Sequence, residues 1–159
     1  MAKSTVFDLA ALTAAPHTGP RSILRLLQVF ARLSAYPEGQ TGRAMLAYLP
    51  DAEVKSLLEG VRFERITPAT VSSRRVSMAG LKEVRDRGVS TVDSGTVAGV
   101  VSVAAPIFGA DGHVIAALSI GGPSARIGRH LSAVESAVRD SAEEVSRVLG
   151  YGDEWPPMR

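Results

Sequence analysis

Two serines stand in the most β-prone stretches of the chain, and paired hydroxyls of this kind bind small polar molecules or, beside a base, act as nucleophiles. The stretches at 100–108 and 113–120 are apolar, rich in β-branched residues, and separated by a Gly-Ala-Asp-Gly turn, which predicts a β-hairpin. Each stretch contains one serine, Ser102 in the first and Ser119 in the second. The hairpin decides whether these hydroxyls meet.

Pairing Phe108 with His113 across the turn places Ser102 directly opposite Ser119. The same sheet face then carries small side chains that leave room above them for a ligand. Its predicted members are Ser102, Ala104, Ala117, Ser119 and Gly121, while the opposite face carries Val101, Val103, Ala105, Ile107, Val114, Ala116, Leu118 and Ile120. Taken alone, the pattern also fits two serines that bond only each other.

The remaining residues offer little for catalysis. The three histidines, at 17, 113 and 130, lie in the N-terminal arm, beside the turn and near a helix start, and no base is assigned to either serine. A nucleophile elbow, a phosphate loop, metal-ligand spacing and cysteine are all missing from the sequence. We therefore expect no catalytic residues, no metal, no cofactor and no enzymatic activity.

Composition predicts one globular domain in a chain of 159 residues. Hydrophobic residues make up 45% and aromatic residues only 5%, so Ala, Val, Leu and Ile must build the core. No apolar run reaches the roughly 18 residues of a membrane span. The lack of cysteine suits the cytoplasm, and a formal charge of +2 without a basic cluster argues against a dedicated nucleic-acid surface.

Apolar spacing and breaker residues predict the other elements. Helices are expected from Pro20 to the Pro37–Gly39 stop, over Gly42–Tyr48, from an Asp51 cap to Gly60, from Ser77 to Gly88, and over Leu131–Leu149 before Gly150; a short strand is expected over Val89–Val92. Residues 1–19 read as a flexible arm and residues 151–159 as a loose tail. The pattern mixes helices with an antiparallel hairpin.

Four segments resemble the effector domain of the IclR family of bacterial transcription regulators. They lie at 42–50, 81–88, 99–108 and 116–123, and the last two are the most specific. The resemblance covers Thr41 to about Gly150. Residues 20–39 look like the first helix of the family's winged helix-turn-helix, but the recognition helix and wing that should follow have no counterpart before Thr41.

The resemblance implies an α+β fold in which helices flank a twisted antiparallel sheet of the GAF and PAS sort, preceded by an N-terminal helix. It implies a small-molecule effector, often an organic acid, and a homo-oligomer, either dimer or tetramer. Relatives bind the effector with residues at the positions of Ser102, Ser119 and Gly121. An acidic residue is common at Val92, beside Asp93. Gln40 and Thr41 match the start of the other wall of the pocket, and backbone amides near Gly42 would add hydrogen-bond donors.

We therefore predict the ligand-sensing domain of an IclR-type transcription regulator, over residues 41–150, that controls DNA binding by its oligomer. DNA would be bound only through a complete helix-turn-helix, so we expect no sequence-specific binding by this chain, and no membrane association. The alternatives are a truncated protein that dimerises with intact regulators and, less favoured, a small hydrolase. An exposed sheet edge and the apolar helix over 20–35 predict self-association.

Overall fold

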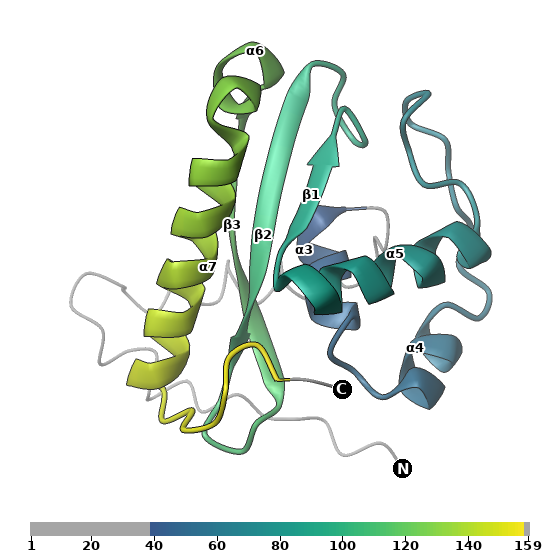
Figure 1. The fold of residues 1–159 in the computed structure, drawn as a ribbon. Helices are drawn as coiled ribbons and strands as arrows, with labels where there is room; N and C mark the ends of the chain where they lie inside the picture. The colour runs from purple at the N-terminus through teal and green to yellow at the C-terminus, as the bar shows by residue number, and fades with distance from the viewer. Residues whose placement is uncertain (1–38, 158–159) are drawn as a thin grey trace, which may run out of the picture. The chain divides into compact units, whose positions relative to one another are not determined.

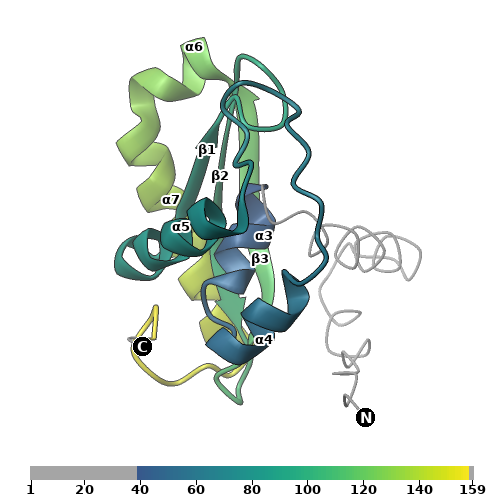
Figure 2. The ribbon, with the colours of Figure 1, turned by 90° about the vertical axis from the view of Figure 1, so that its right-hand side faces the viewer.

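The computed structural model describes residues 39–157, and the expected arm and first helix lie outside this range. Its centre is a three-stranded antiparallel sheet in the order β1-β2-β3 (Figure 1). The strands are β1 (Ser90–Asp93), β2 (Val100–Phe108) and β3 (Val114–Pro123). Figure 2 shows α7 on one side of the sheet and α3 on the other. The predicted α+β class, with helices flanking an antiparallel sheet, is confirmed.

Six helical segments accompany the sheet in the described part of the chain. They are α3 (Gln40–Leu46), α4 (Asp51–Leu57), α5 (Arg74–Arg87), α6 (Ser124–Ile127), the 3-10 helix η1 (Gly128–His130) and α7 (Leu131–Val148). The sequence predicted α3, α4, α5 and α7, with different ends, but not α6 or η1. Within residues 39–157, none of these helices combines the length and apolarity that crossing a bilayer requires.

Two predicted helix starts are wrong. The backbone N–H of Val76 donates to Ser73 Oγ at 3.3 Å, and this cap begins α5 three residues before the expected Ser77. Asp51 does not cap α4, because Pro50 occupies the cap and Asp51 is the first helical residue. The Asp51 carboxylate instead accepts a 2.9 Å hydrogen bond from Arg85 of α5. The predicted end of α5 at a left-handed glycine is confirmed.

The hairpin is closed by a shorter loop than the four-residue turn predicted from the sequence. The N–H of Gly109 donates to the carbonyl of His113 at 2.9 Å, and Gly112 takes a left-handed conformation with φ 75°. A β-bulge between Ile107 and Phe108 shifts the pairing once more. Since the two single shifts add, residues beyond the bulge return to the faces predicted for them.

The bulge changes the packing near the turn. Val114 pairs with Phe108 and packs against the core around that ring. The prediction that Val114 lies on the same sheet face as Val103 is therefore wrong. Ile115 packs there instead. The N–H of Phe108 donates to Ser146 Oγ of α7 at 3.0 Å, and Ser146 Oγ donates in turn to the carbonyl of Ala142. Helix α7 therefore satisfies an amide at the irregular point of the strand.

Two apolar clusters hold the domain together. The α7 cluster joins one sheet face, which we call the aliphatic face, to Ile127, Val138 and Ala142; that face comprises Val101, Val103, Ala105, Ile107, Ala116, Leu118 and Ile120. The second cluster centres on Phe108, with Tyr48 packed edge-on against it at 5.1 Å between ring centres. Helices α3, α4 and α5, together with the residues directly after α3 and α4, supply most of this second cluster.

The segment after α7 is packed rather than loose, contrary to expectation, as far as residue 157. Tyr151 is only 3% exposed and stacks on Phe108, with 5.2 Å between ring centres. Trp155 packs against both apolar clusters. The guanidinium of Arg147 donates to the carbonyls of Tyr151 and Asp153, which holds the backbone of this segment against the end of α7.

Candidate functional site

Strand alternation gathers the predicted ligand-binding residues of the hairpin on one side of the sheet, opposite the aliphatic face. Strand β1 adds Ser90 and Val92, which pair with Ala104 and Ser102. We call the whole set the small-residue face: Ser90, Val92, Ser102, Ala104, Pro106, Ala117, Ser119 and Gly121. The sequence predicted five of these eight residues to share a face, and the observed strand register places them there.

The predicted pairing of the two serines is wrong. Ser102 lies opposite Gly121, and Ser119 lies opposite Ala104, because the register is shifted by two positions. No hydrogen bond joins the two hydroxyls in the described structure, so they do not simply satisfy each other. A Cβ added at Gly121 would lie 3.0 Å from Ser102 Oγ, which shows that the Ser102 hydroxyl occupies the space beside this glycine.

Ser90 is the member of this face that sequence reasoning missed. It is 1% exposed, and its Oγ has no hydrogen-bond partner among the described residues. Buried hydroxyls are usually paired, and an unpaired one costs roughly 1 to 3 kcal/mol. Its position in β1, alternating with Val92, is the signal that could have found it once the strand's pairing with β2 was known.

Helix α3 covers part of the small-residue face. Thr41 and Gly42, in its first turn, are buried, and α3 packs against all three strands. Beneath this cover Ala104 is fully buried, whereas Ser119 and Gly121 on β3 are exposed. The face is thus closed at its centre and open along β3.

Two loops meet beside the Ser102 end of the face. The hydroxyls of Thr67 and Thr70 donate to the carbonyls of Ser94 and Gly95, so the segment before α5 is tied to the loop after β1. A Cβ at Gly95 would lie 2.3 Å from Val92 Cγ1, which places that loop directly against the face. The sequence did not predict this contact, because it depends on long-range pairing of two loops.

Asp93 is not brought together with the other predicted site residues. It pairs with Val101 and therefore points to the opposite side of the sheet from Val92 and Ser102. Its carboxylate accepts hydrogen bonds from Ser94 Oγ at 2.8 Å and from Ser124 Oγ at 2.9 Å. In this structure Asp93 ties the end of β1 to the start of α6.

A partly buried cation lies next to Gly42 in sequence. The guanidinium of Arg43 packs over Gly80 of α5, and its Nε is buried without a hydrogen-bond partner in residues 39–157. Loss of water on burial lowers the pKa of Arg43, and the nearby Glu83 carboxylate partly opposes this shift. An arginine in this state gains from an anionic partner.

The arrangement is suited to binding. Neither described histidine, His113 or His130, lies on the small-residue face, so no imidazole is placed there to activate a serine. In the part of the chain that the structure describes, no three His, Asp or Glu side chains are placed to hold a metal ion. Hydroxyls that neither bond each other nor have a base nearby are donors and acceptors for a ligand.

Comparison with known protein families gives one matching description, "Bacterial transcriptional regulator IclR C-terminal", over residues 20–147. The HTH-type transcriptional regulator XynR of Escherichia coli K12 is 33% identical over 111 residues, which are 69% of this chain and 44% of XynR. KdgR from the same organism is 30% identical over 131 residues, 82% of this chain and 50% of KdgR. The chain thus spans about half the length of these curated relatives.

Solved structures agree with the sequence matches. The crystal structure of the C-terminal domain of E. coli KdgR superposes with a TM-score of 0.68 at 31% identity, covering 74% of this chain and 71% of that domain. The matched relatives are named as transcriptional regulators, as predicted, rather than as enzymes. The boundaries expected for the arm, the helix-turn-helix remnant and the effector domain remain predictions.

Proposed function

The chain belongs to the family of IclR-type C-terminal domains of bacterial transcription regulators, and from this premise we propose that it senses a small polar metabolite on its small-residue face. The ligand would enter over Ser119 and Gly121, where β3 leaves the face open, and extend beneath α3 towards Ser102 and the buried Ser90. Effector binding is general to this family. That the small-residue face is the binding site in this chain is our proposal.

The observation that carries the proposal is the buried, unpaired hydroxyl of Ser90. It shares a face with Ser102 and Ser119, so three hydroxyls lie on neighbouring strands within one small area. A ligand oxygen that hydrogen-bonds to Ser90 would remove the cost of leaving that hydroxyl unsatisfied. A buried polar group without a partner is uncommon in a native structure and needs an explanation, and a ligand at this face would supply one.

Charge favours an acidic ligand. Arg43 follows Gly42 in the helix that covers the face, and its guanidinium is partly desolvated, with Nε lacking a hydrogen-bond partner and Glu83 near enough to oppose the lowering of its pKa. The predicted acidic member of the site, Asp93, points away from the face. We therefore propose a small organic acid, whose carboxylate would be attracted by Arg43 while its other oxygens meet the serine hydroxyls.

Thermal-shift measurements and calorimetry with a panel of small organic acids and uncharged polar metabolites test this proposal. A ligand that binds only the folded chain raises its melting temperature. Replacing Ser119 by Leu should fill the open part of the face and abolish binding, whereas Ser132→Leu on the exposed side of α7 should leave binding unchanged. A ligand whose affinity is equal in the two variants would place the binding site elsewhere.

The wider role is that of a regulator whose DNA binding responds to the ligand, and this too is proposed, since the chain matches only about half of each relative. Sequence readout requires side chains at base edges, and the described residues form an effector domain. At physiological salt, the purified chain should bind random duplex DNA and operator-like duplex DNA with the same weak affinity. A sequence-specific gel shift by the chain alone would contradict this.

A further inference from the structure

One carboxylate of α7 joins the two segments on either side of the corner between α5 and β1. Glu135 accepts hydrogen bonds from Nη2 of Arg87, the last residue of α5, at 2.7 Å to each of its two oxygens. It also accepts a 2.6 Å hydrogen bond from Thr91 Oγ1 in β1. The Glu135 side chain is only 15% exposed, so these charge-assisted bonds lie largely out of water, where they are strong.

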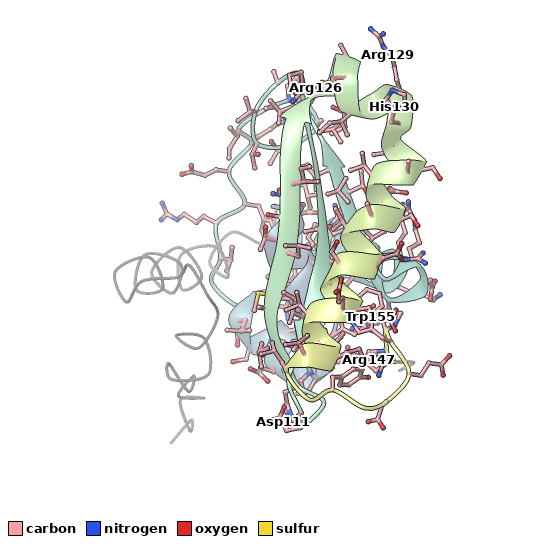
Figure 3. The ribbon with its side chains drawn as sticks, turned by 90° about the vertical axis from the view of Figure 1, so that its left-hand side faces the viewer. Asp111, Arg126, Arg129, His130, Arg147 and Trp155 are labelled. Atoms are coloured by element: carbon pink, nitrogen blue, oxygen red, sulfur yellow. The ribbon has the colours of Figure 1, made fainter. Side chains whose placement is uncertain are left out.

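The corner itself is short and well packed. Only Gly88 and Val89 separate the end of α5 from Ser90, and Val89 belongs to the α7 cluster. The segment after α7 covers the corner from outside, with Trp155 beside the last turns of that helix (Figure 3). A Cβ added at Gly88 would lie 3.1 Å from Pro156 Cγ and 3.6 Å from Trp155 Cζ3. The start of β1 is therefore held by contacts with α7 and with the segment that follows it.

The hydrogen bond to Thr91 bears on where the neighbouring side chains of β1 lie. Thr91 pairs with Val103 and points to the aliphatic face, on the side of α7. Because side chains alternate along a strand, Ser90 and Val92 then point to the small-residue face. Strand β1 has only four residues, and β2 is its one hydrogen-bonded neighbour in the sheet of residues 39–157. A bond from α7 to the second of these four residues is thus a large part of what holds the strand.

The Ser90 hydroxyl opposes the observed position of β1. It is buried without a partner among the described residues, whereas water would satisfy it if the strand moved outward. The hydrogen bonds to Glu135, on the other side of the sheet, offset this tendency. A ligand oxygen bonded to Ser90 would remove the same cost. The contacts with α7 and a ligand therefore favour the same position of β1.

We infer that Glu135 is a positioning residue for the ligand site, although it lies on the opposite side of the sheet. Glu135, Arg87 and Thr91, which we call the Glu135 clamp, hold β1 where Ser90 can bond a ligand oxygen. The inference rests on the proposed function for its ligand, but the clamp can be tested without one. When the clamp is removed, β1 moves outward more often, and a ligand must bind a less populated arrangement of the site.

A single introduced thiol measures the position of β1, because the chain contains no cysteine. Iodoacetamide should alkylate the thiol of Ser90→Cys slowly, since residue 90 is buried. Adding Glu135→Ala should accelerate alkylation about tenfold. Glu135→Gln keeps an oxygen that can accept from Thr91 and should restore much of the protection. Asp140→Ala, at an exposed position of α7, should leave the rate unchanged.

A second buried serine shows whether the effect is local. Ser77 of α5 is fully buried, and its hydroxyl also has no partner in the described part of the chain. The thiol of Ser77→Cys should therefore react equally slowly with and without Glu135→Ala. Equal acceleration at residues 77 and 90 would indicate a general loss of stability and would overturn the inference. An unchanged rate at residue 90 would overturn it as well.

Hydrogen exchange gives a second measurement on the chain without cysteine, in case Ser90→Cys does not fold. Glu135→Ala should accelerate exchange of the β1 amides about tenfold and leave the amides in the middle of β2 unchanged. Local opening of β1 produces this difference between two paired strands, whereas global unfolding does not. Uniform acceleration in both strands would contradict a clamp that acts on β1.

The small organic acids used to test the proposed function separate the two hypotheses. An acid that raises the melting temperature of the unsubstituted chain should bind Glu135→Ala about tenfold more weakly, and Glu135→Gln with a much smaller loss. Equal affinity for Glu135→Ala and the unsubstituted chain would overturn the positioning role. If none of the acids binds the unsubstituted chain, the proposed function fails, and the alkylation and exchange rates still decide whether the clamp holds β1.

Discussion

Residues that are neighbours in the sequence of β2 lie on opposite faces of the sheet, and the two faces differ in how they are covered. Val101, Val103 and Ile107 are buried by α7, and this side is filled with branched aliphatic side chains. Ser102 and Ala104 alternate with them on the other side, where α3 covers only part of the surface. The same strand therefore serves stability on one face and exposes hydrogen-bonding groups on the other.

The difference follows from side-chain size. Branched residues on the aliphatic face reach the helix and exclude water, which contributes roughly 25 cal/mol for each Å² of apolar surface buried. Alanine, serine and glycine on the small-residue face are shorter than the branched residues opposite, α3 buries only the centre of the face, and the Ser90 hydroxyl stays unpaired there. A face that is poorly filled by its own side chains is where a ligand can add contacts.

The sharpest test compares substitutions on the two faces of one strand. Ile107→Ala should lower the free energy of unfolding by about 2 to 5 kcal/mol, because the residue is 7% exposed and its removal leaves a cavity under α7. Ser102→Ala, on the other face, should change it by less than about 0.5 kcal/mol. Urea unfolding of both variants measures this. Equal losses would refute the division of roles.

Ser146→Ala tests how α7 supports the irregular end of the hairpin. The substitution leaves the buried N–H of Phe108 without its acceptor, so unfolding free energy should fall by about 1 to 3 kcal/mol. Hydrogen exchange at the Phe108 amide should accelerate more than exchange in the middle of β2. Unchanged protection of that amide would mean that another acceptor replaces the serine.

High pH should weaken the second cluster before the α7 cluster. Burial raises the pKa of Tyr48, so the folded state disfavours its ionised form. Its contribution is fully present below about pH 10, the ordinary tyrosine pKa, and is lost above it by up to about 1.4 kcal/mol per pH unit. Tyr48→Phe should flatten the fall in stability between about pH 10 and 12. Burial also raises the pKa of Tyr151, which contributes in the same direction.

The smallest effect on stability is expected at Ser90. Ser90→Ala removes a buried hydroxyl that has no partner, so the unfolding free energy should stay within about 0.5 kcal/mol or rise. Affinity for an identified ligand should nevertheless fall by about 0.5 to 1.5 kcal/mol, the usual contribution of a neutral hydrogen bond. Calorimetry on this variant distinguishes a hydroxyl that binds the ligand from one that is buried without any role in binding.

Apart from Val114, the sequence placed the hairpin residues that it assigned on the correct faces, because strand alternation survives a register error of two. It failed to predict which residues face each other, since the loop length and the bulge at Ile107 and Phe108 depend on packing against α7. Asp93 was assigned to the site from resemblance, but its pairing with Val101 turns it away. A single-residue difference along a strand decides such assignments.

Contacts between distant loops were beyond prediction. Thr67 and Thr70 lie between α4 and α5, outside every element predicted from the sequence, and nothing in their spacing indicates that they bind the carbonyls after β1. The packed segment after α7 could have been suspected. Aromatic residues are scarce in this chain, and Tyr151 and Trp155 fall within five residues of each other at a place expected to be loose.

The position of Trp155 gives the domain a built-in optical reporter. It is the only tryptophan in the chain, and it touches both apolar clusters while its indole Nε1 is buried. Its emission should therefore shift to longer wavelength if the end of the chain detaches from either cluster. Because the chain contains a single tryptophan, tryptophan emission can be assigned to this junction without labelling.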